Sequence, residues 1–317
     1  MSIAAVNQRL DVATIVAASV AIVIWSSSFA GIAYGLQAFT PAELSLLRFL
    51  IASAVLVVPV AAGLIKLPAL RDWPAILALG LSGITLYQLM LGYGMTRISV
   101  GGAAVVIALA PGVTAALAAL RLGERITGRT IAGLAVAFSG VVLITVGAGR
   151  DIHFEPTTLL LLVAVFATSF YFVFQKPVLA RTSTMGFTVA SIFAGTLGLI
   201  PFGLSLPAKI AIVPHAQIWS AAYLAIGPTI VGYLAWNFAL SRAPAAKVSS
   251  FMYVQPLVAS AIAWFCLGQV PTLLTAVGGV LAIGGVVLTV GATRAATPQP
   301  KIVVAPRAVP TSCCTQS

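Results

Sequence analysis

Charged side chains are scarce in this chain. Asp, Glu, Lys and Arg make up 7% of its 317 residues, whereas a soluble domain carries roughly 25%. Apolar residues make up 60%, and the mean hydropathy is +1.10. The charges are too few to cover the surface of a water-soluble particle. This shortage excludes a soluble enzyme, a nucleic-acid-binding domain and a disordered chain, and it predicts an integral membrane protein.

Residues that carry covalent or metal chemistry are also missing. The three cysteines lack the spacing of a zinc site or a disulfide framework, and both histidines fall in predicted loops. No HExxH, Walker A or GxSxG motif occurs. We therefore expect no metal site, no cofactor, no enzymatic activity and no ATP-driven pumping by this chain alone. No apolar run holds a deep Asp or Glu either, which disfavours a dedicated proton relay inside the membrane.

Long apolar runs dominate what is present. A helix needs about 20 mainly apolar residues to cross a hydrocarbon core about 30 Å thick. Division of the chain at its charges, prolines and polar clusters yields ten such runs, so the sequence predicts an all-α membrane protein with ten transmembrane helices. The predicted spans are residues 12–36, 42–64, 73–96, 99–121, 128–148, 156–176, 185–205, 217–241, 247–267 and 271–292.

Basic residues indicate how these spans are oriented, because Lys and Arg accumulate on the cytoplasmic side of membranes. With the N-terminus inside, most of the 17 basic residues face the cytoplasm. Only Arg97, Arg150 and Lys209 face outward, and Arg48 lies within the second span. We therefore expect both termini on the cytoplasmic side.

An internal repeat becomes visible when the sequence is aligned with itself at an offset of 145 residues. Between 111 and 143 the ungapped alignment has 14 identities in 33 positions, and Pro111 aligns with Pro256. Each copy holds five predicted helices, an odd number, so the second copy crosses the membrane in the opposite sense. The loop at 121–129 is basic in the first copy and uncharged in the second, which agrees with this inversion. Inverted repeats are typical of secondary transporters whose halves rock around a central site.

The repeat predicts how the chain is organised, as two inverted five-helix repeats (5+5) flanked by short termini. The four prolines near the C-terminus indicate a disordered tail. The predicted parts are a cytoplasmic N-terminus (1–11), a first repeat (12–148), a connecting loop (149–155), a second, inverted repeat (156–292) and a disordered cytoplasmic tail (293–317).

Paired prolines mark the predicted centre of the protein. Pro111 and Pro256 fall near the middle of the fourth and ninth spans. A proline there frees the backbone carbonyl four residues earlier, which would be that of Ile107 or Met252. Because the two breaks occupy matching positions in the repeats, we interpret them as lining a central cavity rather than as tolerated packing.

Polar and aromatic side chains at a similar depth complete the candidate site. Taken singly, each also fits an ordinary role, since Trp and Tyr often mark the bilayer interface and Ser often mediates helix contacts. Together, rings, hydroxyls and amides suit a small zwitterion or amphiphilic metabolite and suit a polyanion poorly. The candidate substrate-binding residues are Trp25, Ser28, Tyr87, Gln88, Pro111, Tyr171, Tyr233, Trp236, Tyr253, Gln255 and Pro256.

One basic residue lies inside a predicted span. Arg48 is about 10 Å from the start of its helix, and Glu43 precedes it on the same helix. Arg48 either extends to the interface or pairs with Glu43, or it meets a carboxylate of the substrate. Both residues are therefore candidates for gating or carboxylate pairing.

Three segments of the chain form a recognisable pattern. They are Trp25-Ser26-Ser27-Ser28-Phe29, Pro41…Arg48-Phe49, and the block from Ala110-Pro111 through Leu122-Gly123-Glu124 to Gly140-Val141. This pattern resembles the drug/metabolite transporter superfamily, and within it the ten-helix EamA-type exporters, over residues 12–292. The resemblance implies a bacterial inner-membrane carrier that exports amino acids or related metabolites by alternating access. The chain is most similar to the bacterial aromatic amino acid exporters.

The chain also departs from the family pattern. Its second copy has Leu267-Gly268-Gln269 where the first has Leu122-Gly123-Glu124, so the two halves are unequal. Four-helix members of the superfamily use an embedded Glu in their first helix, which this chain lacks. Their proton-antiport mechanism is therefore not carried over by the resemblance.

We expect a monomeric secondary transporter that exports aromatic and other hydrophobic amino acids, with membrane lipid around it and no nucleic-acid partner. A sugar or nucleotide-sugar carrier of the same superfamily is the alternative within transport, although phosphates would require more cations in the cavity than Arg48. An intramembrane enzyme or a scaffold is the alternative from another class. The missing catalytic groups argue against the first, and the paired prolines argue against the second.

Overall fold

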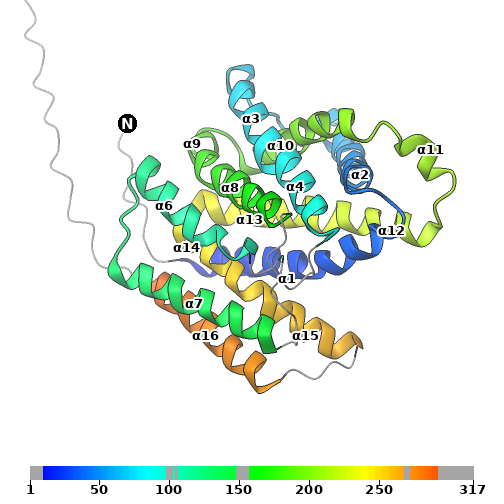
Figure 1. The fold of residues 1–317 in the computed structure, drawn as a ribbon. Coiled ribbons are helices and arrows are strands. Elements are labelled where there is room, and N and C mark those ends of the chain that lie inside the picture. The colour runs from blue at the N-terminus through cyan, green and yellow to red at the C-terminus, as the bar shows by residue number, and fades with distance from the viewer. Residues whose placement is uncertain (1–9, 98–102, 104–105, 148–156, 268–271, 292–317) are drawn as a thin grey trace, which may run out of the picture.

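Every regular element in the described part of the chain is a helix. The structure is a computed structural model that describes residues 10–97, 103, 106–147, 157–267 and 272–291. Figure 1 shows the arrangement of these helices. The α-helices are α1 (Val12–Gly35), α2 (Pro41–Ala61), α3 (Trp73–Gly80), α4 (Tyr87–Gly94), α6 (Ala110–Leu122), α7 (Gly128–Gly147), α8 (Thr158–Phe174), α9 (Lys176–Leu179), α10 (Thr184–Leu199), α11 (Leu206–Ile210), α12 (His215–Leu224), α13 (Gly232–Arg242), α14 (Ala245–Ser250), α15 (Gln255–Leu267) and α16 (Leu273–Gly291).

Shorter turns of other helix types join several of these elements. Three are 3₁₀ turns and two are π-helical turns, so some of the long rods change their helix type partway along. The 3₁₀ turns are η1 (Leu70–Asp72), η3 (Ile200–Phe202) and η5 (Phe251–Val254), and the π-helical turns are η2 (Leu81–Leu86) and η4 (Ala225–Val231).

Eight rods in the described part of the chain are long and apolar enough to cross a membrane. They confirm an all-α protein with membrane-length helices. They are Val12–Gly35, Pro41–Ala61, Leu70–Gly94, Gly128–Val146, Thr158–Leu179, Thr184–Phe202, His215–Arg242 and Leu273–Gly291.

The fourth and ninth predicted spans differ from this group. Within the fourth, α6 is a shorter apolar helix, and residues 98–102 and 104–105 lie outside the described residues. The ninth consists of α14, η5 and α15, which follow one another without a gap, and it is not among the eight rods. The ten-helix count therefore stays a prediction. The predicted connecting loop and C-terminal tail, and nearly all of the N-terminal segment, also lie outside the described residues.

Local sequence signals explain where several helices begin and end. At the start of α2, Thr40 and Glu43 form a capping box: the Glu43 carboxylate accepts the Thr40 N–H at 2.8 Å, and the Thr40 hydroxyl accepts the Glu43 N–H at 3.3 Å. Pro41 follows at the first helical position, where its missing N–H costs nothing. Helix α6 ends at Leu122, and the next residue, Gly123, has a φ of +66°, which favours glycine.

The two π-helical turns occupy equivalent places in the two repeats. Turn η2 lies in the rod that runs from α3 to α4, and η4 lies in the rod from α12 to α13. The repeat offset carries residues 81–86 onto 226–231, which is nearly the whole of η4. π-helical turns are rare and concentrate at functional sites. Their equivalence therefore indicates a shared role at the centre of the molecule.

Helices α7 and α16, which are also equivalent in the repeat, pack side by side at one edge of the molecule (Figure 1). A Cβ atom on Gly133 would lie 2.8 Å from the Gly285 carbonyl oxygen, and one on Gly140 would lie 2.5 Å from that of Gly278. Rising residue numbers on one helix meet falling numbers on the other, so the two helices run antiparallel. Gly133 aligns with Gly278 and Gly140 with Gly285, so the contact is symmetric. Small residues allow this close backbone approach.

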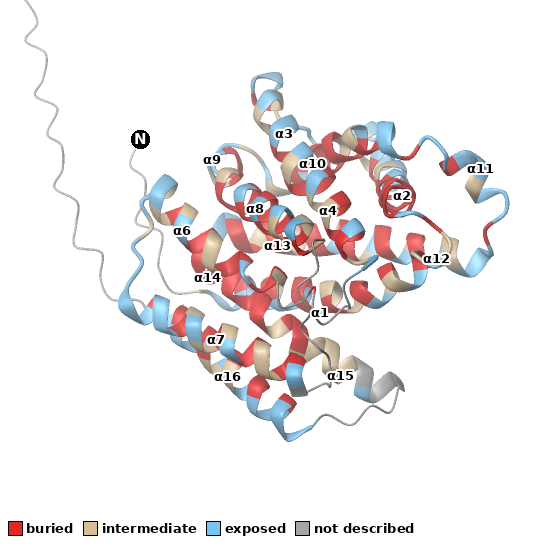
Figure 2. Ribbon diagram, in the orientation of Figure 1, coloured by how far each residue is buried: buried red, intermediate tan, exposed pale blue. Residues whose placement is uncertain are grey.

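The outside of the described bundle is largely apolar. Large hydrophobic side chains such as Leu120 and Val280 are 85% and 72% exposed, and Figure 2 shows exposed stripes along α7 and α16. Polar side chains such as Thr229 and Asn237 are fully buried instead. This distribution suits a lipid environment, in which apolar surface carries no penalty and polar groups bind each other inside.

We predict that the packing of α7 on α16 tolerates no added methyl group. In Gly140→Ala the new Cβ would lie 2.5 Å from backbone atoms of Ala282 and Gly278, and relief of this overlap should cost about 1–3 kcal/mol. Gly284→Ala is the matched control, because nothing lies within 4 Å of its Cβ position. Thermal unfolding of the detergent-solubilised protein should show a lower melting temperature for Gly140→Ala only. Equal melting temperatures for the two variants would contradict this packing.

Candidate functional site

A cavity lies near the middle of the bundle, between residues of both repeats. About 50 Å³ of its space can hold the centre of a water molecule. The cavity is therefore narrow. The lining residues are Trp25, Ser28, Phe29, Ile32, Arg48, Gly83, Tyr87, Gln88, Leu91, Thr168, Tyr171, Phe172, Tyr233, Met252 and Gln255.

Most of the polar and aromatic residues that the sequence singles out meet in this cavity. Those that line it are Trp25, Ser28, Tyr87, Gln88, Tyr171, Tyr233 and Gln255, together with Arg48. Four other candidates, Pro111, Trp236, Tyr253 and Pro256, are not among the lining residues. Sequence reasoning also missed several lining residues. Apolar side chains such as Phe29 and Leu91 look like any other residue of a membrane span, so no sequence signal distinguishes them.

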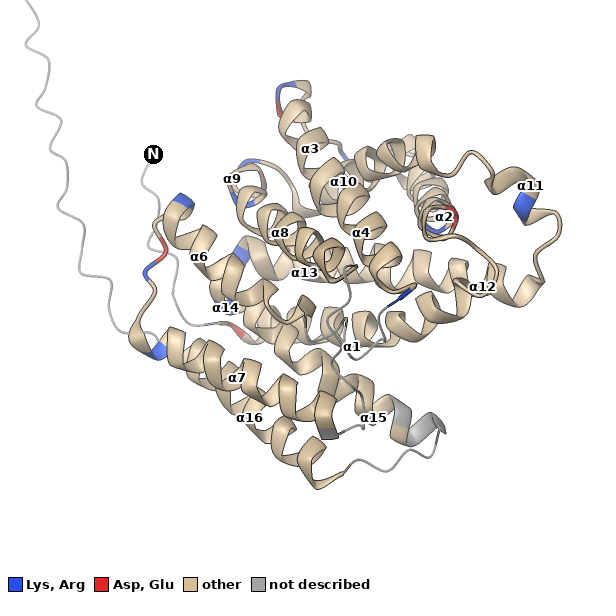
Figure 3. Cartoon of the chain, in the orientation of Figure 1, with Lys and Arg blue, Asp and Glu red and all other residues tan. Residues whose placement is uncertain are grey.

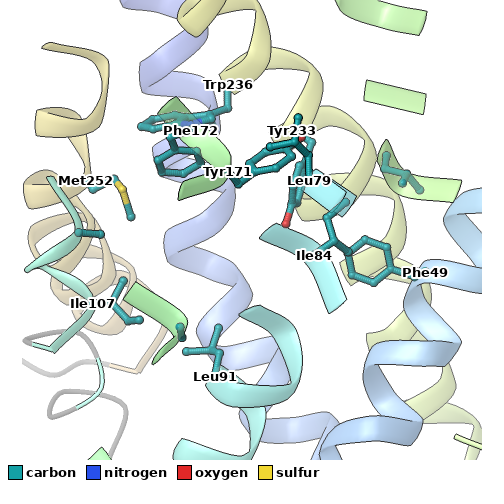
Figure 4. Packing of buried hydrophobic residues seen from close by; sticks show 14 of the residues in the cluster. Phe49, Leu79, Ile84, Leu91, Ile107, Tyr171, Phe172, Tyr233, Trp236 and Met252 are labelled. Carbon is teal, nitrogen blue, oxygen red and sulfur yellow. The ribbon is translucent and has the colours of Figure 1, made fainter. Parts of the chain in front are cut away.

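Aromatic rings form one wall of the cavity. The Tyr233 ring lies 5.8 Å from that of Trp25 and 6.3 Å from that of Tyr171, both in edge-to-face contacts. Figure 4 shows Tyr171 and Tyr233 side by side, with Phe172 next to Trp236. Edge-to-face pairs stabilise each other beyond their buried area. The wall is therefore a connected cluster that presents ring surface to the cavity.

Trp236 lies behind this wall. Its side chain is fully buried, and its ring centre is 5.0 Å from that of Trp25 and 5.1 Å from that of Phe172. Trp236 does lie on the same helical face as Tyr233, as its spacing predicts. The rings of Trp25 and Phe172, however, separate Trp236 from the cavity. Trp236 thus supports residues that line the cavity.

In each repeat, a glycine packs against an aromatic ring that belongs to the other repeat. A Cβ on Gly83, in η2, would lie 2.2 Å from the Tyr171 ring, and one on Gly232, directly after η4, would lie 2.5 Å from the Trp25 indole nitrogen. The same nitrogen donates a hydrogen bond of 3.0 Å to the carbonyl of Pro228 in η4. The two π-helical turns therefore position the aromatic wall.

Arg48 is buried in the cavity among neutral partners. Its Nε and one terminal nitrogen donate to the Thr229 hydroxyl at 3.1 and 2.9 Å, and the other terminal nitrogen donates to the Gln88 side-chain oxygen at 3.5 Å. The guanidinium carbon is 5.2 Å from the Phe49 ring centre. None of the described carboxylates lies within ion-pairing distance. The described partners of the guanidinium are therefore neutral hydroxyl, amide and ring groups.

The pairing of Arg48 with Glu43, one of the alternatives from the sequence, does not occur. The Glu43 carboxylate caps α2 and accepts a hydrogen bond of 2.6 Å from the Ser205 hydroxyl. Five residues separate Glu43 from Arg48, which rotates their side chains by about 140° around the helix. Arg48 therefore points into the cavity while Glu43 remains at the helix start.

The paired prolines break their spans differently from the simple kink expected. Pro111 and Pro256 are the second residues of α6 and α15, where the missing N–H would have no intrahelical partner. Before Pro256 the helix tightens into η5, and the Met252 carbonyl accepts the N–H of Gln255. The prediction that this carbonyl is freed is therefore wrong, because a 3₁₀ turn replaces the lost bond.

The carbonyl groups just before the two prolines bind the opposite repeat instead. Ser169 of α8 donates to the Ala110 carbonyl at 3.2 Å, and Ser26 of α1 donates to the Gln255 carbonyl, also at 3.2 Å. Ala110 and Gln255 are equivalent in the repeat alignment. Each helix break is therefore joined to the other half by a serine, which places the breaks at the boundary between the repeats.

Three carboxylates of the N-terminal half of the chain contact basic residues of the second repeat. Asp11 pairs with Arg242, and Asp72 binds Arg181 at 2.6 Å. The third, Glu124, is treated below. All lie at helix ends that the sequence assigns to the cytoplasmic side, and Figure 3 shows charged residues at such ends. The hydrogen bonds from Arg242 and Thr14 lower the pKa of Asp11 to about 2.

Glu124 makes the most extensive of these contacts. Its carboxylate lies 3.5 Å from the Lys176 ammonium and accepts the backbone N–H groups of Ala245 and Ala246 at 2.9 and 3.3 Å. Lys176 also donates to the Ala243 carbonyl. Glu124 is the residue of the first repeat that becomes Gln269 in the second. The asymmetry seen in the sequence therefore coincides with a contact that holds the two repeats together.

Comparison with known proteins assigns the family. The EamA-like transporter family matches residues 12–146 and again residues 156–291. The chain belongs to the EamA-like transporter family. It is therefore a transporter and a multi-pass membrane protein, not an enzyme, and the family domain occurs in it twice.

Relatives with assigned roles are transporters as well. A probable terminal-alkyne amino-acid exporter of Streptantibioticus cattleyicolor is 36% identical, over 84% of this chain and 90% of the relative. A probable amino-acid metabolite efflux pump of Escherichia coli is 26% identical, over 88% and 95%. A crystal structure of a chain that is 22% identical superimposes with a TM-score of 0.69 over 87% of this chain and 95% of that one. That likeness supports the fold.

We predict that Glu124 stabilises the folded protein more than Asp11 does. Glu124→Gln removes the charge from a carboxylate that is mostly buried and has three partners, which should lower the melting temperature by about 3 °C, as expected for a loss of about 1 kcal/mol. Asp11→Asn is the control, because Asn still caps α1 and the pair it removes is exposed to solvent. If the two variants unfold at the same temperature, Glu124 does not hold the repeats together.

Proposed function

We propose that this protein exports aromatic and other hydrophobic amino acids across a bacterial inner membrane. The observation that carries the proposal is the cavity, in which a buried guanidinium faces an aromatic wall contributed by both repeats. The relatives named as amino-acid exporters support the same substrate class.

Arg48 binds the substrate carboxylate in this proposal. Its planar fork of donors matches a carboxylate better than any other side chain does. Thr229 and Gln88 are neutral, so they hold the guanidinium without neutralising it. Nucleotide sugars would place additional phosphates in the cavity, and Arg48 is the only basic residue among the described lining residues. A monocarboxylate therefore fits better than a phosphate ester.

The aromatic wall binds the substrate side chain. Trp25, Tyr87, Tyr171 and Tyr233 present rings to the cavity, and Phe172 and Met252 extend its apolar surface. An aromatic substrate gains edge-to-face contacts there in addition to its buried area. Ser28, Thr168 and Gln255 add neutral hydroxyl and amide groups to the lining.

Alternating access follows from two inverted repeats of five spans each. The antiparallel packing of equivalent helices α7 and α16 and the equivalent positions of η2 and η4 support the inversion. The narrow cavity supports a state in which access is restricted. The ion pairs of Asp11, Asp72 and Glu124 would open when the cavity opens to the cytoplasm. In this proposal the transporter is a monomer with both termini on the cytoplasmic side.

We predict that Tyr87→Ala reduces phenylalanine efflux from proteoliposomes about tenfold, because an aromatic contact worth about 1.5 kcal/mol is lost. Tyr87→Phe keeps the ring and should keep most of the activity. Phe166→Ala is the control, since Phe166 is 60% exposed on the outside of α8. A competition panel of the twenty amino acids against labelled phenylalanine measures the preference for apolar side chains. Absence of efflux for every amino acid would reject the proposed function.

A further inference from the structure

We infer that this cavity recognises the carboxylate and the ring of its substrate but not an amino group, so that aromatic monocarboxylate anions are substrates whose export the membrane potential drives. The inference rests on the proposed function and narrows the substrate class of the same site. It follows from the charges of the described lining residues, which include one cation and no anion.

The acidic residues of the described chain are engaged away from the cavity. Asp11, Asp72 and Glu124 bind basic residues at the helix ends, and Glu43 caps α2. The other titratable side chains among the described lining residues are Tyr87, Tyr171 and Tyr233, and a tyrosine hydroxyl ordinarily carries no charge at neutral pH. Two further acidic residues, Asp151 and Glu155, lie outside the described residues and outside the predicted spans. No described carboxylate is therefore placed to bind a substrate ammonium.

The charge balance of the occupied cavity separates the two kinds of substrate. A buried cation without a counter-charge is unfavourable, and a bound carboxylate supplies that counter-charge to Arg48. A monoanion leaves the cavity neutral. A zwitterion brings an ammonium group a few bonds from its carboxylate, so the cavity keeps a net positive charge and the ammonium meets only rings, hydroxyls and amides. A substrate analogue without the amino group should therefore bind almost as tightly, whereas an analogue without the carboxylate should not bind.

The same balance supplies a driving force. Export of a monoanion moves one negative charge outward, which an inside-negative potential favours. A potential of 100 mV supports roughly a 50-fold outward concentration ratio for one elementary charge. Such transport needs no intramembrane carboxylate to relay protons, and the predicted spans contain no deep one. Arylalkanoates and aromatic 2-oxo acids are the chemical class that fits.

Three ligands with the same ring test the inference. Phenylpyruvate is a monoanion without an amino group, phenylalanine is a zwitterion, and phenylalaninamide keeps the amino group but has no carboxylate. In proteoliposomes at neutral pH, with potassium and valinomycin setting the potential, phenylpyruvate should compete with labelled phenylalanine at least as well as unlabelled phenylalanine. Phenylalaninamide should not compete. Efflux of labelled phenylpyruvate should rise at least fivefold at 100 mV inside negative, relative to no potential and after subtraction of protein-free vesicles.

The outcomes separate this inference from the proposed function. Efflux of phenylalanine together with inert phenylpyruvate overturns the inference and leaves the proposed function intact. If the rate of phenylpyruvate efflux does not change with the membrane potential, the claim that the potential drives export is overturned. Efflux of neither compound rejects the proposed function as well.

Variants of Arg48 locate the effect in the cavity. Arg48→Gln should abolish phenylpyruvate efflux, and Arg48→Lys should retain part of it because the charge remains. Arg129→Gln is the control, since it removes an equal charge from an exposed site at the start of α7. Phenylpyruvate efflux by Arg48→Gln at the original rate would overturn the inference. If this variant does not fold, the ligand series on the unmodified protein decides the question.

Discussion

Backbone polar groups inside a membrane have no water to bind, so every interruption of a helix there needs a partner within the protein. In this transporter the partners come from the opposite repeat. Ser26 and Ser169 bind the carbonyls that precede Pro256 and Pro111, and the Trp25 indole binds the carbonyl of Pro228. These three carbonyls are thus bonded across the boundary between the repeats, whereas the Met252 carbonyl is bonded within its own 3₁₀ turn.

The cavity is a consequence of these interruptions. The π-helical turns place Gly83 and Gly232 against Tyr171 and Trp25, and the resulting ring cluster leaves narrow space beside Arg48. Close helix contact is concentrated elsewhere, where α7 and α16 meet through glycines. The molecule therefore combines an edge of close backbone packing with a narrow central cavity between the two repeats. Contacts such as that of Glu124 with Lys176 join the halves at the helix ends.

Much of the site was foreseeable from residue type and depth. Tyr87, Gln88 and Tyr233 stood out because polar and aromatic side chains are unusual in the middle of an apolar span, and they do line the cavity. Apolar lining residues such as Ile32 carry no such signal. Trp236 shares the helical face of Tyr233, but neighbouring rings cover it, and this depends on three helices at once. The proline in η4 has no counterpart in η2, so no shared sequence pattern predicts the two π-helical turns.

Composition and periodicity alone determined that the chain is helical, belongs in a membrane and consists of two related halves. They could do so because hydropathy and the internal repeat are properties of the chain itself, whatever its neighbours in space. Only the tertiary structure decided which side chains bind each other. Arg48 binds Thr229 rather than Glu43 because the two side chains leave α2 in different directions. Arg48 points into the cavity, and Glu43 folds back to the start of the helix. A buried charge is defined by what surrounds it, and those surroundings come from segments that are distant along the chain.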